Sequence, residues 1–196
     1  MKKRSLFFPA LLCATLTFTA CKDDKGVTPP PASGTFTVRA PVFDRWTYFS
    51  FEQSDTIRTD GSYTTLADSR SWDLAFHRGD IRTNGGASGP GRGGAFKTEA
   101  AEMNAVTENP AEVTYTPDVR AEITFPTMRE TADQSRNEVL ADWYTSSGMP
   151  PTYVVHPDIY LIRTAEGKYA KVKFLDYTND LGAGGYITFT YEYPVE

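Results

Sequence analysis

The chain has few cysteines and few histidines. Its 196 residues include two of each. Cys13 lies in the apolar start of the chain and Cys21 follows it, so a chain cut before Cys21 keeps one cysteine, which leaves no internal disulfide and no cysteine-based metal site. His77 and His156 are far apart and have no carboxylate-rich spacing around them, which disfavours a zinc site.

The chain also has fewer basic than acidic residues. The chain carries 20 basic and 25 acidic residues, a formal charge of −5. Because nucleic-acid binding needs a basic face for phosphate contacts, this balance argues against a nucleic-acid partner. The sequence has no GxSxG or HExxH motif and no cysteine nucleophile in the mature chain, so an enzyme is not the expected class.

The first twenty residues are typical of an export signal. A basic start, Lys2–Arg4, is followed by the apolar run LFFPALLCATLTFTA, and Ala20 precedes Cys21. This pattern resembles a bacterial lipoprotein signal, so residues 1–20 are predicted to be removed and Cys21 to be lipidated. An ordinary secretory signal cut at another position is the alternative. Removal leaves 17 basic and 25 acidic residues, a formal charge of −8.

Residues 21–34 are predicted to form a flexible tether. Lys22–Lys25 (KDDK) resembles the acidic export signal of Bacteroidetes lipoproteins, which implies an outer-membrane anchor exposed at the cell surface; a solvated spacer is the alternative. The following GVTPPPASG contains three consecutive prolines with Gly and Ser, so it favours an extended segment without a core.

From residue 35 to 196 the sequence predicts one mostly β domain. TFTVRA and RWTYFSFE are rich in β-branched and aromatic residues. Near the end, DIYLIRT, YAKVKFLDY and YITFTYEY are separated by short turns, which predicts an antiparallel meander. In the last strand one face should be buried, and it consists of Ile187, Phe189, Tyr191 and Tyr193.

One segment departs from the strand pattern. In TADQSRNEVLADWY, apolar residues recur at Val139, Leu140, Trp143 and Tyr144 without Gly or Pro between them. This spacing predicts a helix of about three turns over residues 133–144. The expected fold class is therefore mostly antiparallel β with one or two short helices.

The run SWDLAFHRGDIRTNGGASGPGRGGA, residues 71–95, contains seven of the fifteen glycines. A nucleotide-binding loop would need a Lys-Ser or Lys-Thr pair and a following helix, and this run has neither. The pattern favours a strand leading into a tight or mobile loop.

Three strings in order resemble the HmuY family of Bacteroidetes haem-binding lipoproteins: RWTYFSF with WDLAFHR-GD-IRTNGG, RTAEGKYAKVKFLDYTND, and GYITFTYEYP. The resemblance implies a hand-shaped, mostly β, hemophore-like protein that captures haem (iron protoporphyrin IX). It further implies that haem comes from host haemoproteins and passes to a TonB-dependent outer-membrane receptor for iron acquisition.

Haem iron accepts imidazole or thioether ligands, and the available set is His77, His156, Met103, Met128 and Met149. Aligned on the C-terminal strings, the ligand region of the family corresponds to about residues 120–155. Met128 and Met149 flank the predicted helix, which would be about 18 Å long, and each five-residue flank reaches about 17 Å, so their sulfurs could meet. Met128 and Met149 are the predicted iron ligands.

Other readings of these residues stay open. Methionine is most often a flexible core filler. His156 is the alternative ligand, and His77 is favoured as a hydrogen-bonded residue within the sheet. Met103 lacks the flanking prolines of the other two methionines and is favoured as packing or surface.

Aromatic side chains should cover the porphyrin, and those nearest the predicted ligands are Trp143, Tyr144 and Tyr153. Trp143 could equally anchor the predicted helix to the core. Arg129 could pair with a haem propionate or stay exposed without a partner.

A surface carbohydrate-binding or adhesion module is the alternative function. In that case Trp46, Trp72 or Trp143 would present a flat platform. The oligomeric state, the source of haem and the receptor stay open at this stage.

Overall fold

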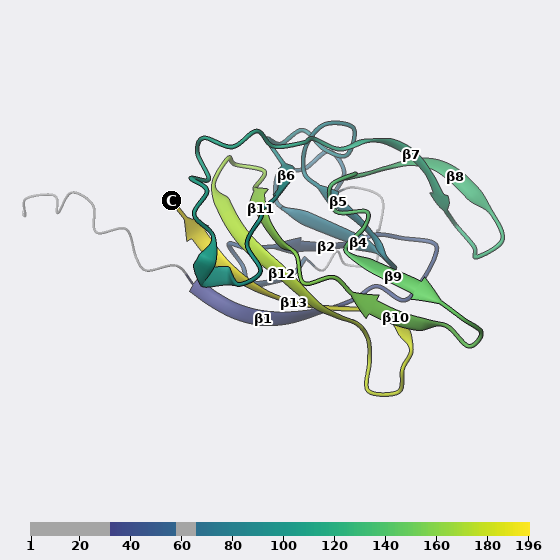
Figure 1. Ribbon diagram of the computed structural model, residues 1–196. Coiled ribbons are helices and arrows are strands. Elements are labelled where there is room, and N and C mark those ends of the chain that lie inside the picture. The colour runs from purple at the N-terminus through teal and green to yellow at the C-terminus, as the bar shows by residue number, and fades with distance from the viewer. Residues whose placement is uncertain (1–31, 58–65) are drawn as a thin grey trace, which may run out of the picture. The chain divides into compact units, whose positions relative to one another are not determined.

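Strands dominate the chain, as the alternating pattern predicts. The computed structural model describes residues 32–57 and 66–196, which belong to one compact unit, residues 31–196. Within these residues there are thirteen strands and one short 3-10 helix (Figure 1). The predicted signal peptide, Cys21 and the tether up to residue 31 lie outside the described residues.

The larger sheet has five antiparallel strands. Their order is β1 (Ala32–Arg39), β13 (Gly184–Val195), β12 (Tyr169–Thr178), β11 (Ile159–Arg163) and β6 (Gly94–Lys97). Neighbouring β11, β12 and β13 follow one another in the sequence, so the predicted meander is confirmed. β1 begins at Ala32, which pairs with Tyr193, so residues 32–34 of the predicted tether belong to this strand.

Burial along β13 follows the predicted alternation. Ile187, Phe189, Tyr191 and Tyr193 are all buried, and the residues between them are half-buried. The same holds on β12, where the buried residues alternate with Lys171 and Lys173. One face of this sheet therefore forms the core.

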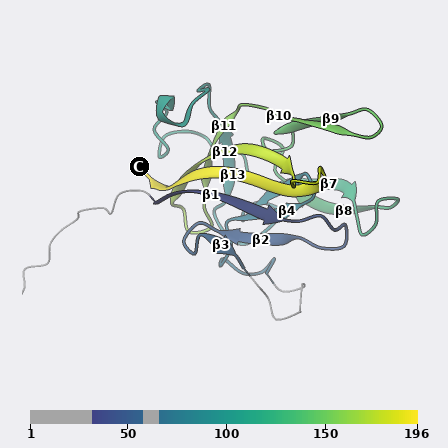
Figure 2. The ribbon, with the colours of Figure 1, turned by 90° about the horizontal axis from the view of Figure 1, so that it is seen from below.

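A second sheet covers that face. It consists of β3 (Asp55–Thr56), β2 (Thr47–Ser50), β4 (Leu74–His77) and β5 (Asp80–Thr83), in this order. The ring centroids of Phe49 on β2 and Phe76 on β4 lie 5.2 Å and 5.7 Å from that of Phe189 on β13. These contacts pack the sheets together, and Figure 2 shows β2 and β4 alongside β1 and β13.

Two hairpins extend from the sheets. One is formed by β7 (Val119–Thr124) and β8 (Thr131–Arg136), and the other by β9 (Tyr144–Ser147) and β10 (Thr152–Val155). Both project from the same side, away from the C-terminus (Figures 1 and 2).

The predicted helix over residues 133–144 is wrong. Its first residues belong to β8, and the rest form turns that lead into β9. Asn137 explains the difference, because its amide nitrogen donates to Thr116 and Asp118 and its backbone N–H donates to the carbonyl of Ile81. Leu140 and Trp143 are still buried, so the apolar spacing reports burial but not a helix.

The single helix in the described residues is the 3-10 turn η1 (Met103–Ala105). No helix in this part of the chain is long and apolar enough to span a membrane.

The glycine-rich run forms a tight loop around Asn84, which is fully buried. The Asn84 amide donates to the carbonyls of Ser69 and Trp72 and accepts from the N–H of Gly91. A Cβ atom on Gly89 would lie 2.2 Å from the Asn84 side-chain oxygen, so this close approach needs glycine.

Candidate functional site

A cleft of about 420 Å³ lies between the two hairpins. Thr124 of β7 lines one side, and Ser146 and Tyr153 of the β9–β10 hairpin line the other. Its floor is the turn between β4 and β5. The remaining lining residues are Phe43, His77, Arg78, Gly79, Asp80, Arg136, Ala141, Tyr144 and Tyr177.

Three tyrosines form an aromatic wall of the cleft. The ring of Tyr177 stacks on that of Tyr144 with centroids 4.5 Å apart, and the Tyr153 ring meets Tyr177 edge-on at 4.7 Å. Burial raises the pKa of the Tyr144 and Tyr177 hydroxyls above the ordinary value. Both hydroxyls are therefore protonated at neutral pH, and the hydroxyl of Tyr177 donates to that of Tyr144, which leaves the Tyr144 O–H as a donor for a ligand.

Trp143 packs against this aromatic wall from the core side. It is fully buried, and its ring packs 4.6 Å from Tyr144 and 4.8 Å from Phe174. Its indole N–H donates to the carbonyl of Gly79 in the floor. Trp143 does not line the cleft and lies in the core beneath it.

The floor is a two-residue turn between His77 and Asp80, which face each other in the β4–β5 register. Arg78 occupies the first turn position with φ of +52°. Its guanidinium donates to the carbonyl of Pro41 at 2.7 Å and lies 4.5 Å from the centre of the Phe43 ring.

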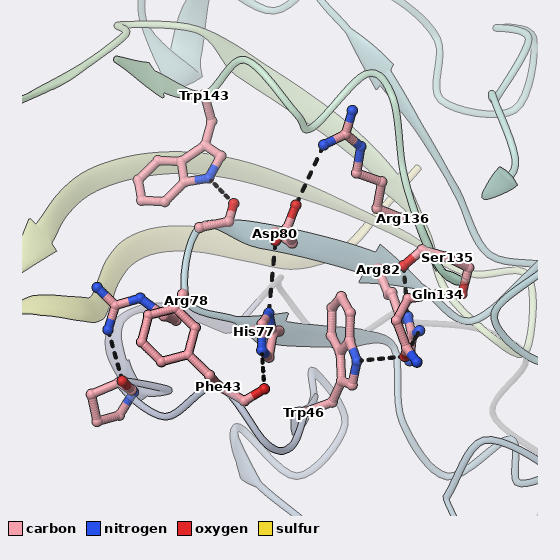
Figure 3. A network of polar contacts seen from close by, with 12 residues as sticks. Phe43, Trp46, His77, Arg78, Asp80, Arg82, Gln134, Ser135, Arg136 and Trp143 are labelled. Carbon is pink, nitrogen blue, oxygen red and sulfur yellow. Dashed lines mark hydrogen bonds and ion pairs between the residues drawn. The ribbon is translucent and has the colours of Figure 1, made fainter. Parts of the chain in front are cut away.

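A chain of polar contacts runs through the floor (Figure 3). The ring of His77 is 1% exposed, and its Nε2 lies 2.9 Å from the carbonyl oxygen of Phe43. Its Nδ1 lies 3.7 Å from a carboxylate oxygen of Asp80 and has no hydrogen-bond partner. Asp80 in turn pairs with Arg136 of β8 at 3.5 Å, so the network joins the floor to the β7–β8 hairpin.

Arg82 attaches the β7–β8 hairpin to the second sheet. It donates to the carbonyl of Ser135 and to the Gln134 side chain, and its guanidinium lies 3.7 Å from the centre of the Trp46 ring (Figure 3). Burial lowers the pKa of Arg82 to about 10, so the residue remains charged at neutral pH.

Met128 and Met149 lie at equivalent positions of the two hairpins. Met128 lies in the loop that connects β7 and β8, and Met149 lies in the loop that connects β9 and β10. Their side chains are 71% and 97% exposed. Met128 also lines a shallow hollow with Pro126, Thr127 and the segment Pro41–Asp44. Both methionines thus lie at the tips of the hairpins that flank the cleft, and neither is among the residues that line it.

The other predicted site residues are spread around this cleft. Tyr153 lines it, and Arg129 is exposed beside Met128 in the β7–β8 loop. His156 is half-buried after the end of β10, where its backbone N–H donates to the carbonyl of Trp143. His156 therefore lies at the base of its hairpin and Met149 at the tip.

The sequence did not identify Arg78, Phe43 and Tyr177 as residues of the cleft. A two-residue Arg-Gly turn between the apolar run of β4 and the strand β5 was the available signal for Arg78. No local pattern distinguishes Tyr177 from the other tyrosines of the C-terminal meander.

The fold and the cleft together define the class of protein to which this chain belongs. It is an antiparallel β protein with an aromatic and polar cleft between two hairpins, and clefts of this size are where proteins bind small molecules. The chain belongs to the HmuY family, because the family profile described as HmuY protein matches residues 43–191.

Solved structures agree with this assignment. A candidate HmuY-like haem-binding protein from Bacteroides vulgatus is 26% identical with a TM-score of 0.69, over 84% of this chain and 93% of that chain. An apo HmuY analogue from Tannerella forsythia is 25% identical with a TM-score of 0.65, over 85% and 97% of the two chains. A candidate lipoprotein from Bacteroides fragilis is 25% identical with a TM-score of 0.64, over 84% and 90%. Comparison with curated proteins gave no significant match.

Proposed function

We propose that this protein binds haem in the cleft, with Met128 and Met149 as the iron ligands. The observation that carries the proposal is the position of two thioethers at the tips of the hairpins that flank the cleft. The two axial positions of haem iron lie on opposite faces of the porphyrin, so one ligand from each hairpin suits this geometry. Membership of the HmuY family, and the likeness to a candidate haem-binding relative, support it.

The aromatic wall fits a porphyrin. Tyr144, Tyr153 and Tyr177 offer ring faces and edges to a flat ligand, and Phe43 adds an apolar contact near the floor. A large planar ring gains most from burial against such groups.

The proposal extends to the place of the protein in the cell. A lipid on Cys21 anchors the domain to the outer membrane through the tether of residues 22–31, at the cell surface. From there it takes haem from host haemoproteins and passes it to a TonB-dependent receptor. The signal-like residues 1–20 and the likeness to a candidate Bacteroides fragilis lipoprotein support this extension.

Titration of the purified protein with haemin tests the proposal. We expect a Soret band that changes on binding, under oxidising conditions and again after reduction. Met128→Ala and Met149→Ala should each shift the spectrum and weaken binding, because each removes one axial ligand. Met103→Ala in η1 makes the same substitution outside the cleft and should leave the spectrum unchanged.

The possible failures point to different errors. A protein without any Soret change in both redox states does not bind haem, and the function is then wrong. Haem binding with unaltered spectra in both methionine variants rejects the ligands, and a spectral change in His156→Ala would then assign that residue.

The tryptophans give no support to the alternative of a carbohydrate-binding or adhesion module with an aromatic platform, because Trp46, Trp72 and Trp143 are all buried. These are the three tryptophans of the chain.

A further inference from the structure

The backbone of Arg78 adopts an unusual conformation. Its φ of +52° lies in the left-handed region, which glycine, asparagine and aspartate occupy far more readily than arginine. Glycine is present one position later, at Gly79, and not where the positive φ falls. Strained residues of this kind cluster at ligand-binding sites. They persist only where the surrounding structure holds them in place.

The guanidinium of Arg78 carries a charge that no carboxylate balances. It donates to the backbone carbonyl of Pro41 and stacks on Phe43, and none of the ion pairs found among the described residues includes it. Arg136, the other arginine of the cleft, pairs with both Asp80 and Glu138. Arg78 is therefore the cation in the cleft that remains available to an anion.

The hydroxyls of Tyr144 and Tyr177 belong to the same cleft as Arg78. The positive charge of Arg78 acts on the hydroxyls of Tyr144 and Tyr177, although burial has the larger effect and keeps both protonated. The nearby Asp80 is engaged by Arg136 and lies against the His77 ring. An arginine fork beside tyrosine hydroxyls is suited to a carboxylate.

The position of Arg78 at the β4–β5 turn bears on how haem is oriented in the cleft. Haem carries two propionate carboxylates on one edge. Resting on the haem-binding function above, we propose that Arg78 binds a propionate of haem, so that haem enters the cleft with its carboxylate edge toward the β4–β5 turn. Arg129 at the hairpin tip would serve the opposite orientation, with the carboxylates at the mouth of the cleft.

The test compares haemin with its dimethyl ester, in which both carboxylates are neutral. We expect the unmodified protein to bind haemin about tenfold more tightly than the ester, as one charged hydrogen bond requires. Arg78→Gln should remove this preference by weakening haemin binding, while the affinity for the ester stays the same. Arg39→Gln removes the same charge from an exposed position on β1 outside the cleft and should keep the preference.

A second variant separates ligand binding from folding. Arg78→Gly relieves the strain of the positive φ but also loses the contacts with Pro41 and Phe43, so its melting temperature should stay close to that of the parent protein, and its preference for haemin should still be lost. The inference is overturned if both Arg78 variants keep the preference, or if Arg129→Gln abolishes it in their place. Failure to bind either porphyrin would instead overturn the proposed function, and the inference with it.

Discussion

The indole N–H of Trp143 donates to the carbonyl oxygen of Gly79 across 2.9 Å (Figure 3). This bond joins the start of the β9–β10 hairpin to the turn that forms the floor of the cleft. The neighbouring Tyr144 lies directly over Gly79, so two consecutive aromatic residues fix the hairpin to the turn. The position of Met149 therefore depends on contacts at the other end of its hairpin.

Trp143→Phe should destabilise the fold by about 2 to 4 kcal/mol. The change leaves the part-buried carbonyl of Gly79 without its donor and opens space beside Phe174. Urea unfolding measures the free energy of unfolding. As a control, Tyr186→Phe alters an aromatic residue on the half-buried face of β13 and should change it by less than about 0.5 kcal/mol. Equal midpoints for Trp143→Phe and the parent protein would show that the indole bond does not fix the hairpin.

Gly79→Ala should disturb the cleft directly. A Cβ atom there would lie 2.2 Å from the Tyr144 hydroxyl oxygen and 2.5 Å from a ring carbon, so the ring must move. We expect a loss of about 1 to 3 kcal/mol in unfolding free energy and weaker binding of haemin in the same titration. Gly34→Ala is the matched control, since its Cβ would make an ordinary 3.4 Å contact with Tyr191. If both variants bind haemin equally well, Tyr144 does not shape the site.

The parts of the fold that the sequence predicted are those in which burial alternates along one strand. On β13 the aromatic and aliphatic residues occupy every second position, and the pairing strands β11 and β12 come directly before it. Such contacts are local in the chain, so turns and alternation are enough to predict them.

The segment that contains Met128 and Met149 has no such alternating pattern of apolar residues. β8 (TADQSR) has polar residues on both faces, so it shows no alternation, and its pairing with β7 is visible only in the structure. The following turn is fixed by Asn137, whose partners Thr116 and Ile81 are distant in the sequence. The ligand prediction came from the family resemblance, and the helix that separated the two methionines was wrong.

Thioether ligation predicts a dependence on redox state. Sulfur of this kind is a soft ligand and suits ferrous better than ferric iron, so haem should bind more tightly after reduction. Methionine does not titrate, so ligation itself should stay constant between about pH 5 and pH 8, in contrast to ligation by histidine. Haem titrations at several pH values with and without dithionite measure both effects. A ferric complex tighter than the ferrous one would argue against two methionine ligands.

Buried Asp118 should reverse the usual acid sensitivity of a carboxylate. It is 3% exposed and accepts hydrogen bonds from Thr83, Ser88 and Asn137. Burial nevertheless raises the pKa of its carboxyl above the ordinary value of 3.8. In the window between that value and the higher pKa of the folded state, the folded protein holds more protons than the unfolded chain.

The contribution of Asp118 to stability should therefore be complete below about pH 4 and fall as pH rises through this window, by at most about 1.4 kcal/mol per pH unit. Asp118→Asn removes the titration, so the unfolding free energy of the parent protein minus that of the variant should decrease from pH 4 toward pH 7. Asp73 also has a raised pKa from burial, but it is present in both proteins and cancels in the difference. A difference that grows with pH would mean that the hydrogen bonds to Asp118 outweigh its burial.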